Sequence, residues 1–289
     1  MRGTRLRTFL ISLLLLGVAV GASAEVTNKI DKLDLPTNLW FQVGEELVYK
    51  VYWGIIPVGY ATIKTEWTEL EGRKLLAIRY RAASNKVLSA LYPVDSTMES
   101  LIDPVTFKSV RYTKNLREGR HRYNEVTTFD YDRLTAHWLS LTKDKTKTFG
   151  LETETRDLVA FLYALRAWPF VQNETRQYRV MADDDIYDLW LRVKGKEAVK
   201  LSVFGKVASV RVEPDAAFNG IFVRKGKLTA WVSDDERRFV TRVVATLPVV
   251  DIDVVLCEVR GPGDDSWIKA MIAAGKPVST NAAAATSPK

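Results

Sequence analysis

The chain has little of what metal, thiol or triad chemistry requires. Its 289 residues include 1 Cys and 2 His. A lone Cys cannot form an internal disulfide, and His121 and His137 are too few to build a zinc site. No Ser-His-Asp spacing, glycine-rich phosphate loop or nucleotide fingerprint is present. The sequence therefore predicts no catalytic constellation, no metal and no cofactor.

The single Cys257 lies in an alternating run over residues 250–260. Free Cys is among the most buried residue types, so we expect a small apolar core side chain on a strand. A nucleophilic role would need a nearby His, and both histidines are far away in sequence.

Blocks of like charge are also missing. Lys and Arg total 42 against 35 Asp and Glu, and the two signs are interspersed along the chain. This scatter argues against a nucleic-acid partner.

Long apolar runs are missing except at the N-terminus. Arg2, Arg5 and Arg7 precede an apolar run over 9–20, and an Ala-x-Ala pattern ends at Ala24. Residues 1–24 are thus predicted to be a signal peptide cut before Glu25, which leaves no transmembrane anchor and lowers the formal charge from +7 to +4. We expect a soluble exported protein in the periplasm.

Residues 44–63 carry the clearest structural pattern. Two alternating runs flank an interruption that contains Gly54, Pro57 and Gly59. This arrangement predicts a β-hairpin with a constrained loop. Gly59 and Ala61 share one face of the second run, where small side chains indicate either close packing of another layer or room for a ligand.

Similar runs recur along the chain and predict a mainly β fold, an antiparallel curved sheet or a partly closed barrel or sandwich. After an N-terminal arm over 25–43, residues 44–262 are assigned to one β domain, although two subdomains remain an alternative. The expected strands cover 46–53, 58–68, 75–84, 94–101, 106–115, 121–130, 134–142, 176–182, 186–194, 197–204, 207–213, 227–233, 238–246 and 250–260.

One segment has helical periodicity instead. Residues 153–168 place apolar side chains at helical spacing, with Thr153 or Thr155 as a possible cap, Asp157 in the first turn and Pro169 as the stop. We expect this principal helix to pack on the sheet. Residues 263–274 are expected to form a short helix, and 275–289 a disordered tail.

Motifs along the chain resemble one known family, the DUF3108 domain of unknown function, over about residues 44–260. They are Gly44-Glu45-Glu46-Leu47, Tyr49 with Trp53, Gly54, Pro57 and Gly59, Asp157-Leu158 through Tyr163 to Arg166, and residues 225–235. One departure is Arg238-Phe239-Val240, where Arg-x-Pro-Val is the expected form. The resemblance implies a curved or partly closed β sheet in a Gram-negative-type envelope, with no established activity.

Aromatic residues supply the candidate binding site. The chain has 8 Trp, 11 Tyr and 11 Phe, which either fill the core or line a cavity for an apolar or glycan ligand. The predicted ligand-binding residues are Trp53, Tyr60, Arg79, Tyr92 and Trp231. Gly54, Pro57, Gly59, Asp157 and Asp234 are assigned structural roles.

Acidic residues offer weaker candidates. Residues 183–185 with Asp188 lack the spacing of a calcium loop and are interpreted as a solvated turn. Asp234 and Asp235 are neighbours in a turn and are poorly placed to act together on one bond. Arg79 and Arg81 are expected to face solvent or to pair with Asp157, and Arg166 to interact with the helix dipole.

Three functional hypotheses follow. The first is a non-enzymatic periplasmic binding or envelope-maintenance protein with an aromatic-lined groove for a lipid-like or glycan ligand. The second is a carbohydrate-active hydrolase or lyase that uses Asp or Glu with Tyr, which requires residues such as Asp157, Asp183 and Asp234 to converge. The third is an envelope assembly factor that binds a protein through an exposed sheet edge.

Overall fold

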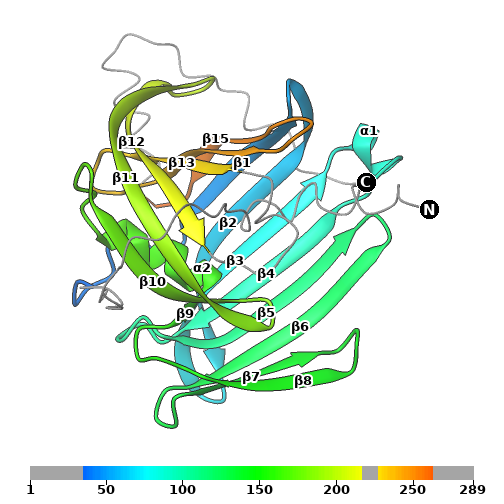
Figure 1. Cartoon of the computed structure of the whole chain (residues 1–289), viewed down its shortest axis with the longest axis vertical. Helices are drawn as coiled ribbons and strands as arrows, with labels where there is room; N and C mark the ends of the chain where they lie inside the picture. The colour runs from blue at the N-terminus through cyan, green and yellow to red at the C-terminus, as the bar shows by residue number, and fades with distance from the viewer. Residues whose placement is uncertain (1–34, 217–226, 263–289) are drawn as a thin grey trace.

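A computed structural model describes residues 35–216 and 227–262. They form a single curved sheet of 15 strands in the order β8-β7-β6-β5-β4-β3-β2-β1-β15-β14-β13-β12-β11-β10-β9 (Figure 1). The predicted mainly β, curved antiparallel architecture is confirmed. Its one parallel pair among the described strands joins β9 to β10.

The first half of the sheet is a meander with short connections. Its strands are β1 (Glu46–Trp53), β2 (Ile56–Leu70), β3 (Arg73–Ser84), β4 (Asp95–Ile102), β5 (Ser109–Glu118), β6 (His121–Asp130), β7 (Thr135–Ser140) and β8 (Lys145–Gly150). A short helix, α1 (Lys86–Ser89), connects β3 to β4.

The second half returns to the starting point. Its strands are β9 (Arg156–Asp157), β10 (Thr175–Ala182), β11 (Asp185–Leu201), β12 (Gly205–Ala216), β13 (Lys227–Ser233), β14 (Val240–Thr246) and β15 (Ile252–Arg260). Because β1 pairs with both β2 and β15, the first and last strands lie side by side in the middle of the sheet.

The predicted hairpin over 44–63 is β1 and β2, joined by a tight turn at Gly54, whose φ is 59°. A Cβ atom on Gly59 would lie 2.3 Å from the backbone oxygen of Ala83, so close packing requires glycine there. Pro57 helps to fix the connection, because its carbonyl accepts a hydrogen bond of 2.6 Å from the Asn85 side chain.

Two parts of the strand prediction need correction. The expected strands 186–194 and 197–204 are one strand, β11, which contains a register shift at Gly195. The strand β8 was not anticipated because Lys145–Gly150 is a polar edge strand with almost entirely exposed side chains, so it has no apolar alternation.

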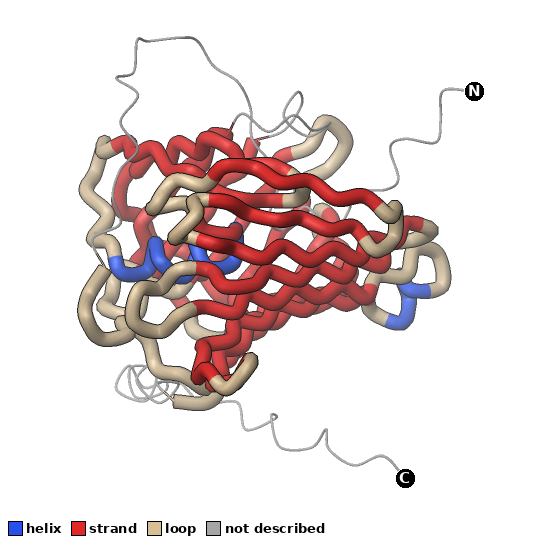
Figure 2. The backbone as a smooth tube through the Cα atoms, turned by 90° about the horizontal axis from the view of Figure 1, so that it is seen from below, coloured by secondary structure: helices blue, strands red, loops and turns tan. Residues whose placement is uncertain are grey.

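The principal helix is shorter than 153–168. It consists of α2 (Leu158–Ala164) followed by a 3-10 turn, Leu165–Ala167. Its N-cap is Asp157 rather than Thr153 or Thr155, because the two residues of β9 are held in extended conformation by pairing with β10. The helix lies inside the curve of the sheet (Figure 2), and nearly all of its side chains are buried.

Cys257 is half-buried on β15, and its thiol donates a hydrogen bond of 3.3 Å to the Val48 carbonyl. Burial raises the pKa of this thiol to about 11, which makes a thiolate at neutral pH rare.

The predicted signal peptide, the helix over 263–274 and the tail over 275–289 lie outside the described residues, as does most of the N-terminal arm. Within the described part of the chain, no helix has the length and apolar character needed to cross a membrane.

Candidate functional site: an apolar cavity around the inner helix

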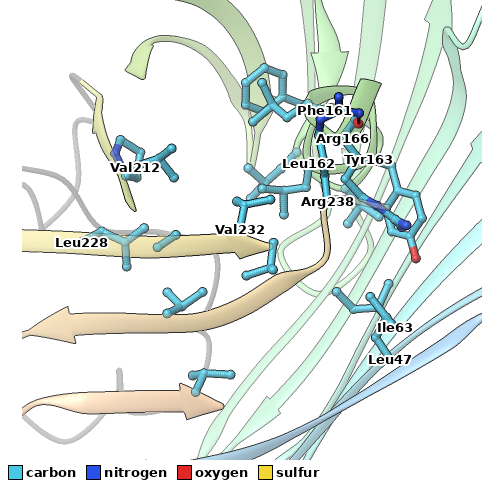
Figure 3. Close-up of a pocket in the computed structure, with 18 of the residues that line it drawn as sticks. Leu47, Ile63, Phe161, Leu162, Tyr163, Arg166, Val212, Leu228, Val232 and Arg238 are labelled. Carbon is cyan, nitrogen blue, oxygen red and sulfur yellow. Dashed lines mark hydrogen bonds between the residues drawn. The ribbon is translucent and has the colours of Figure 1, made fainter. Parts of the chain in front are cut away.

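A cavity of about 160 Å³ lies between α2 and the inner face of the sheet (Figure 3). Strands from both halves of the chain supply one wall. Their side chains are Leu47, Tyr49, Ala61, Ile63, Tyr80, Leu189, Leu191, Val212, Pro214, Leu228, Ala230, Val232, Val240, Val243 and Val254. Most are aliphatic, so the wall is apolar with few aromatic rings.

The helix and the segment after it form the facing wall. The side chains that reach the cavity from this side are Leu158, Val159, Phe161, Leu162, Tyr163, Leu165, Arg166 and Phe170. Leu162 and Phe170 are the partly exposed members, so the cavity is not sealed on this side. Figure 3 shows Phe161, Leu162 and Tyr163 on one side, with Val212, Leu228 and Val232 opposite.

Strand alternation explains why these residues meet. Leu47 and Tyr49 are two apart on β1, and Ala61 and Ile63 are two apart on β2, so each pair faces the same side of the sheet. The register places Leu47 opposite Ile63 and Tyr49 opposite Ala61. The small Ala61 leaves space that a larger side chain would fill, while its neighbour Gly59 serves packing.

A buried ion pair lies beside the cavity, at the C-terminal end of the helix. The guanidinium of Arg166 contacts both carboxylate oxygens of Glu45, and the Tyr163 hydroxyl donates to the same carboxylate at 3.0 Å. Arg166 also packs 5.0 Å from the ring centre of Phe239. The predicted role of Arg166 as a helix-dipole partner is therefore incomplete. Arg166 also anchors the end of the helix to Glu45, the residue that precedes β1.

Burial opposes the charged form of Arg166, but the Glu45 carboxylate outweighs it and raises the pKa of the guanidinium. Arg166 is thus a fixed cation whose charge is already balanced within the protein.

The opposite end of the helix is held by Asp157, which is fully buried. Its carboxylate accepts hydrogen bonds from Ser100 at 2.6 Å and Ser109 at 2.5 Å, and caps the helix by accepting from the Val159 and Ala160 amides. Burial raises its pKa despite these bonds. The expected pairing of Asp157 with Arg79 or Arg81 is wrong, because serines are its partners and both arginines lie on the outer face.

Beyond this anchor the inside of the sheet gains buried polar side chains among the apolar ones. Strands β4 to β7 bury the side chains of Ser96, Ser100, Ser109, Lys114, Glu118, Glu125, Thr127 and Ser140, which we call the polar interior. Lys114 is its central charge, 2.7 Å from Glu125 and in contact with Asp183 from the β10–β11 turn. Burial opposes its charge, but these carboxylates raise the pKa of Lys114.

The five predicted ligand-binding residues do not line the cavity. Tyr60 and Arg79 lie on the outer face, where Arg79 pairs with Glu66 and Glu99. Trp231 also points outward from β13 and donates a hydrogen bond to Glu197.

Trp53 and Tyr92 pack against the edge of the core at the end of the sheet. Tyr92 covers Gly119, where a Cβ atom would lie 2.4 Å from its ring. Burial raises the pKa of Tyr92 to about 12. The structure places none of these five side chains in the lining of the cavity.

Aromatic type was a poor guide to the cavity. Its true markers are the inward positions of the alternating runs, such as Leu47, Tyr49 and Ala61, together with the helical stripe. The alternating runs over 44–63 predict which side chains share a face, but a core position and a cavity wall have the same alternation.

The carboxylates of the hydrolase hypothesis have separate partners. Asp157 caps the helix, Asp183 pairs with Lys114, and Asp234 lies 2.7 Å from Lys196 in the predicted β13–β14 turn. None lines the cavity. In the described ranges, no group of three His, Cys, Asp or Glu side chains could hold a metal ion.

The edge strand β8 bears on the assembly-factor hypothesis. Its exposed Lys145 and Lys147 place charges along the free edge, a feature that discourages pairing with another strand. Lys147 also reaches across to Asp185, 3.3 Å away, and so ties the edge to the β10–β11 turn.

These features define a class of protein in which one curved antiparallel sheet surrounds a buried helix and an apolar cavity. The chain belongs to the family described as "Protein of unknown function (DUF3108)", whose profile matches residues 48–256.

A solved structure shares the fold. It is described as a beta-barrel-like protein of the domain of unknown function DUF1849 from Brucella abortus. The likeness has a TM-score of 0.51 at 10% sequence identity and covers 77% of this chain and 98% of the other. No curated protein matches the sequence.

Proposed function

We propose that this protein is an exported, non-enzymatic binding protein of the bacterial envelope that holds a hydrocarbon chain in the cavity around α2. The observation that carries the proposal is the lining: in a cavity of about 160 Å³, the walls are aliphatic and aromatic apart from Arg166 and Arg238. A glycan would lose its water without gaining hydrogen bonds on such walls. The apolar lining therefore favours a lipid-like ligand over a glycan.

The volume limits the ligand. An apolar cavity of about 150 Å³ holds a molecule of the size of benzene, and pockets for drug-sized ligands span about 300–1,000 Å³. A cavity of about 160 Å³ accordingly takes about six carbons of one chain. The rest of a longer chain lies over the partly exposed side chains at the margin.

Location in the periplasm is part of the proposal. Its support is the N-terminal sequence, where three arginines precede an apolar run and an Ala-x-Ala pattern. Detection of the protein in a periplasmic extract with Glu25 as its first residue would support this, and a cytoplasmic protein that retains residues 1–24 would contradict it.

Binding is tested with n-alkanols of increasing length, which carry no charge. Each added methylene is expected to contribute about 0.8 kcal/mol until about six carbons are buried, after which the gain per carbon falls. Isothermal titration calorimetry measures the series. Native mass spectrometry of protein taken from the periplasm would identify a retained molecule.

Adjacent valines on β14 provide a matched pair of variants. Val243 lines the cavity and Val244 points to the other face of the same strand. Val243→Phe fills the space and is expected to weaken alkanol binding at least ten-fold, whereas Val244→Phe leaves it within two-fold. Equal binding by both variants, or no alkanol binding by the wild type, would overturn the proposal.

A further inference from the structure

Arg238 is a cation on the cavity wall without a carboxylate partner among the described residues. Its Nη1 donates to the backbone oxygens of Arg166 at 3.0 Å and Glu236 at 3.4 Å. The other arginine of the lining, Arg166, differs because Glu45 balances its charge. Arg238 therefore adds a partly exposed positive charge, with no carboxylate partner in the described ranges, to the lining of an apolar cavity (Figure 3).

The turn that carries Arg238 has an unusual conformation. Arg238 has a φ of 47°, in the left-handed region that residues with a Cβ rarely adopt. The Asp235 carboxylate holds it there by accepting hydrogen bonds of 3.1 Å from the amides of Arg237 and Arg238. The following Val240 lines the cavity, so the turn places a cation directly beside the start of an apolar wall.

A guanidinium has five N–H donors in a planar fork that matches the oxygens of a carboxylate or phosphate. In Arg238 only Nη1 has partners in the described structure. We propose that the ligand is an anionic amphiphile, whose hydrocarbon chain occupies the cavity and whose carboxylate or phosphate binds Arg238. This inference rests on the proposed binding of a hydrocarbon chain.

Three probes with the same ten-carbon chain separate the possibilities: decanoate, decyl phosphate and decanol. We expect both anions to bind the wild type at least ten-fold more tightly than decanol at neutral pH and low salt. A preference for decanoate over decyl phosphate would indicate a fatty acid, and the reverse a phospholipid headgroup. Calorimetry provides the dissociation constants.

Arg238→Gln should reduce the affinity for both anions to the affinity for decanol. It should change the affinity for decanol itself by less than two-fold. Arg237→Gln is the control, because this neighbour is a cation outside the lining and pairs with Asp235 at 3.5 Å. Equal binding of anions and decanol by the wild type, or an anion preference that survives in Arg238→Gln, would overturn the inference. Failure of decanol to bind at all would instead overturn the proposed function.

A different observation supports a second inference. One end of the sheet exposes apolar side chains from three connections, which we call the apolar rim. Its members are Ile55, 94% exposed, Ile56, 61%, Val87, 81%, Leu91, 86%, and Val249, 75%. In Figure 1 the β1–β2 turn, α1 and the β14–β15 turn lie at the same end.

Hydrogen bonds join these connections. The Gly54 amide donates to the Asp251 carbonyl at 2.8 Å, which holds the β1–β2 turn against the β14–β15 turn. The Asn85 amide donates to the Val58 carbonyl at 2.8 Å, which holds α1 on the other side. The exposed side chains are therefore neighbours on one surface, and such patches mark interaction sites.

Basic residues flank the apolar rim. Lys86 is exposed on α1, Arg120 is exposed on the β5–β6 turn, and Arg122 is exposed at the start of β6. The turn packs against Tyr92 through Gly119. Two acidic residues also lie at this end: Asp95 pairs with Arg81 at 3.1 Å, and Asp251 is exposed on the β14–β15 turn. Exposed aliphatic tips with a cationic border are complementary to an anionic membrane surface. We infer that this end of the molecule docks onto an anionic lipid bilayer.

Co-sedimentation with vesicles tests the inference, using either phosphatidylcholine alone or a mixture with phosphatidylglycerol. The wild type should bind the anionic vesicles at least five-fold better at low salt. The double variant Ile55→Ser with Ile56→Ser should lose most of this binding. Val105→Ser is the matched control, because Val105 is 83% exposed on the β4–β5 connection, away from the apolar rim.

Failure of the wild type to sediment with anionic vesicles would overturn the docking inference. So would retention of full binding by the double variant. Concentration-dependent dimerisation that the double variant abolishes, without vesicle binding, would assign the apolar rim to self-association instead.

Discussion

The cavity region around α2 and the polar interior are built by the same strand alternation, but their inward side chains differ in polarity. Around α2 the inward positions are apolar and leave a cavity of about 160 Å³. On strands β4 to β7 serine, threonine and charged residues share the inward positions with apolar residues such as Met98, Tyr112 and Trp138, and many of the polar ones bind one another or Asp157. Buried polar groups must be paired, so the polar interior is tightly specified, whereas apolar walls tolerate unfilled space.

Asp157 lies where the two parts meet. It caps the helix that forms the cavity wall, and its other partners are Ser100 and Ser109 of the polar interior. The polar interior fixes the position of the helix through Asp157, and the apolar part is where we propose that the ligand binds.

The largest expected effect comes from breaking the polar interior at Lys114. Lys114→Met leaves the buried Glu125 without its cation, which should destabilise the fold by about 3–5 kcal/mol. Urea denaturation monitored by tryptophan fluorescence measures the free energy of unfolding.

The control is Arg79→Met, which breaks the pairs with Glu66 and Glu99 on the outer face and should cost less than about 1 kcal/mol. The double variant Lys114→Met with Glu125→Leu should recover most of the loss. Similar costs for Lys114→Met and Arg79→Met would contradict the distinction between the two faces.

The next largest effect is expected at Asp157, at the junction between the cavity region and the polar interior. Asp157→Ala removes the helix cap and the acceptor of both serine hydroxyls, so we expect a loss of about 3 kcal/mol in the free energy of unfolding. Asp157→Asn keeps a side-chain oxygen for the cap and should lose about 1 kcal/mol. Equal losses would show that the cap contributes nothing.

The junction also has a pH dependence of defined sign. Burial raises the pKa of Asp157, so the folded protein binds this proton more tightly than the unfolded chain. Asp157 therefore contributes stability below its unfolded pKa that is lost as pH rises towards the raised pKa. The stability deficit of Asp157→Asn relative to wild type should therefore shrink as pH rises above about 4, and a deficit that grows with pH would contradict the assignment.

The smallest effect is expected at Tyr80, which lines the cavity and whose buried hydroxyl has no hydrogen-bond partner among the described atoms. Tyr80→Phe should change the free energy of unfolding by less than about 0.5 kcal/mol. Tyr163→Phe removes a hydrogen bond to Glu45 and should cost about 1–2 kcal/mol. A larger cost at Tyr80 than at Tyr163 would reveal a partner for the Tyr80 hydroxyl.

The sequence predicted the sheet well because its strands alternate. The boundaries expected at 46–53, 121–130 and 227–233 are those of β1, β6 and β13. The family resemblance over 44–260 is confirmed by the match over 48–256. The edge strand β8 escaped prediction because a polar, exposed strand carries no periodic apolar signal.

The cavity could not be predicted to the same degree. The sequence indicates that Ala61 either lets another layer pack closely or leaves room for a ligand. In the structure Ala61 lines the cavity, whose wall is built by strands that lie far apart in sequence. The aromatic residues predicted to bind the ligand, such as Trp231 and Tyr60, point to the outer face. The size of a side chain does not determine which face of the sheet it lies on. Arg238 belongs to the lining because of a turn conformation that no local pattern indicates.

The central claim is that the apolar part of the interior, and not the polar part, receives the ligand's hydrocarbon chain. A crystal structure of the protein with decanoate brominated at its terminal carbon tests it most directly, because anomalous scattering locates the bromine. The account predicts bromine between α2 and strands β13–β14, near Val243. Bromine beside Lys114, or only at the outer surface, would contradict it.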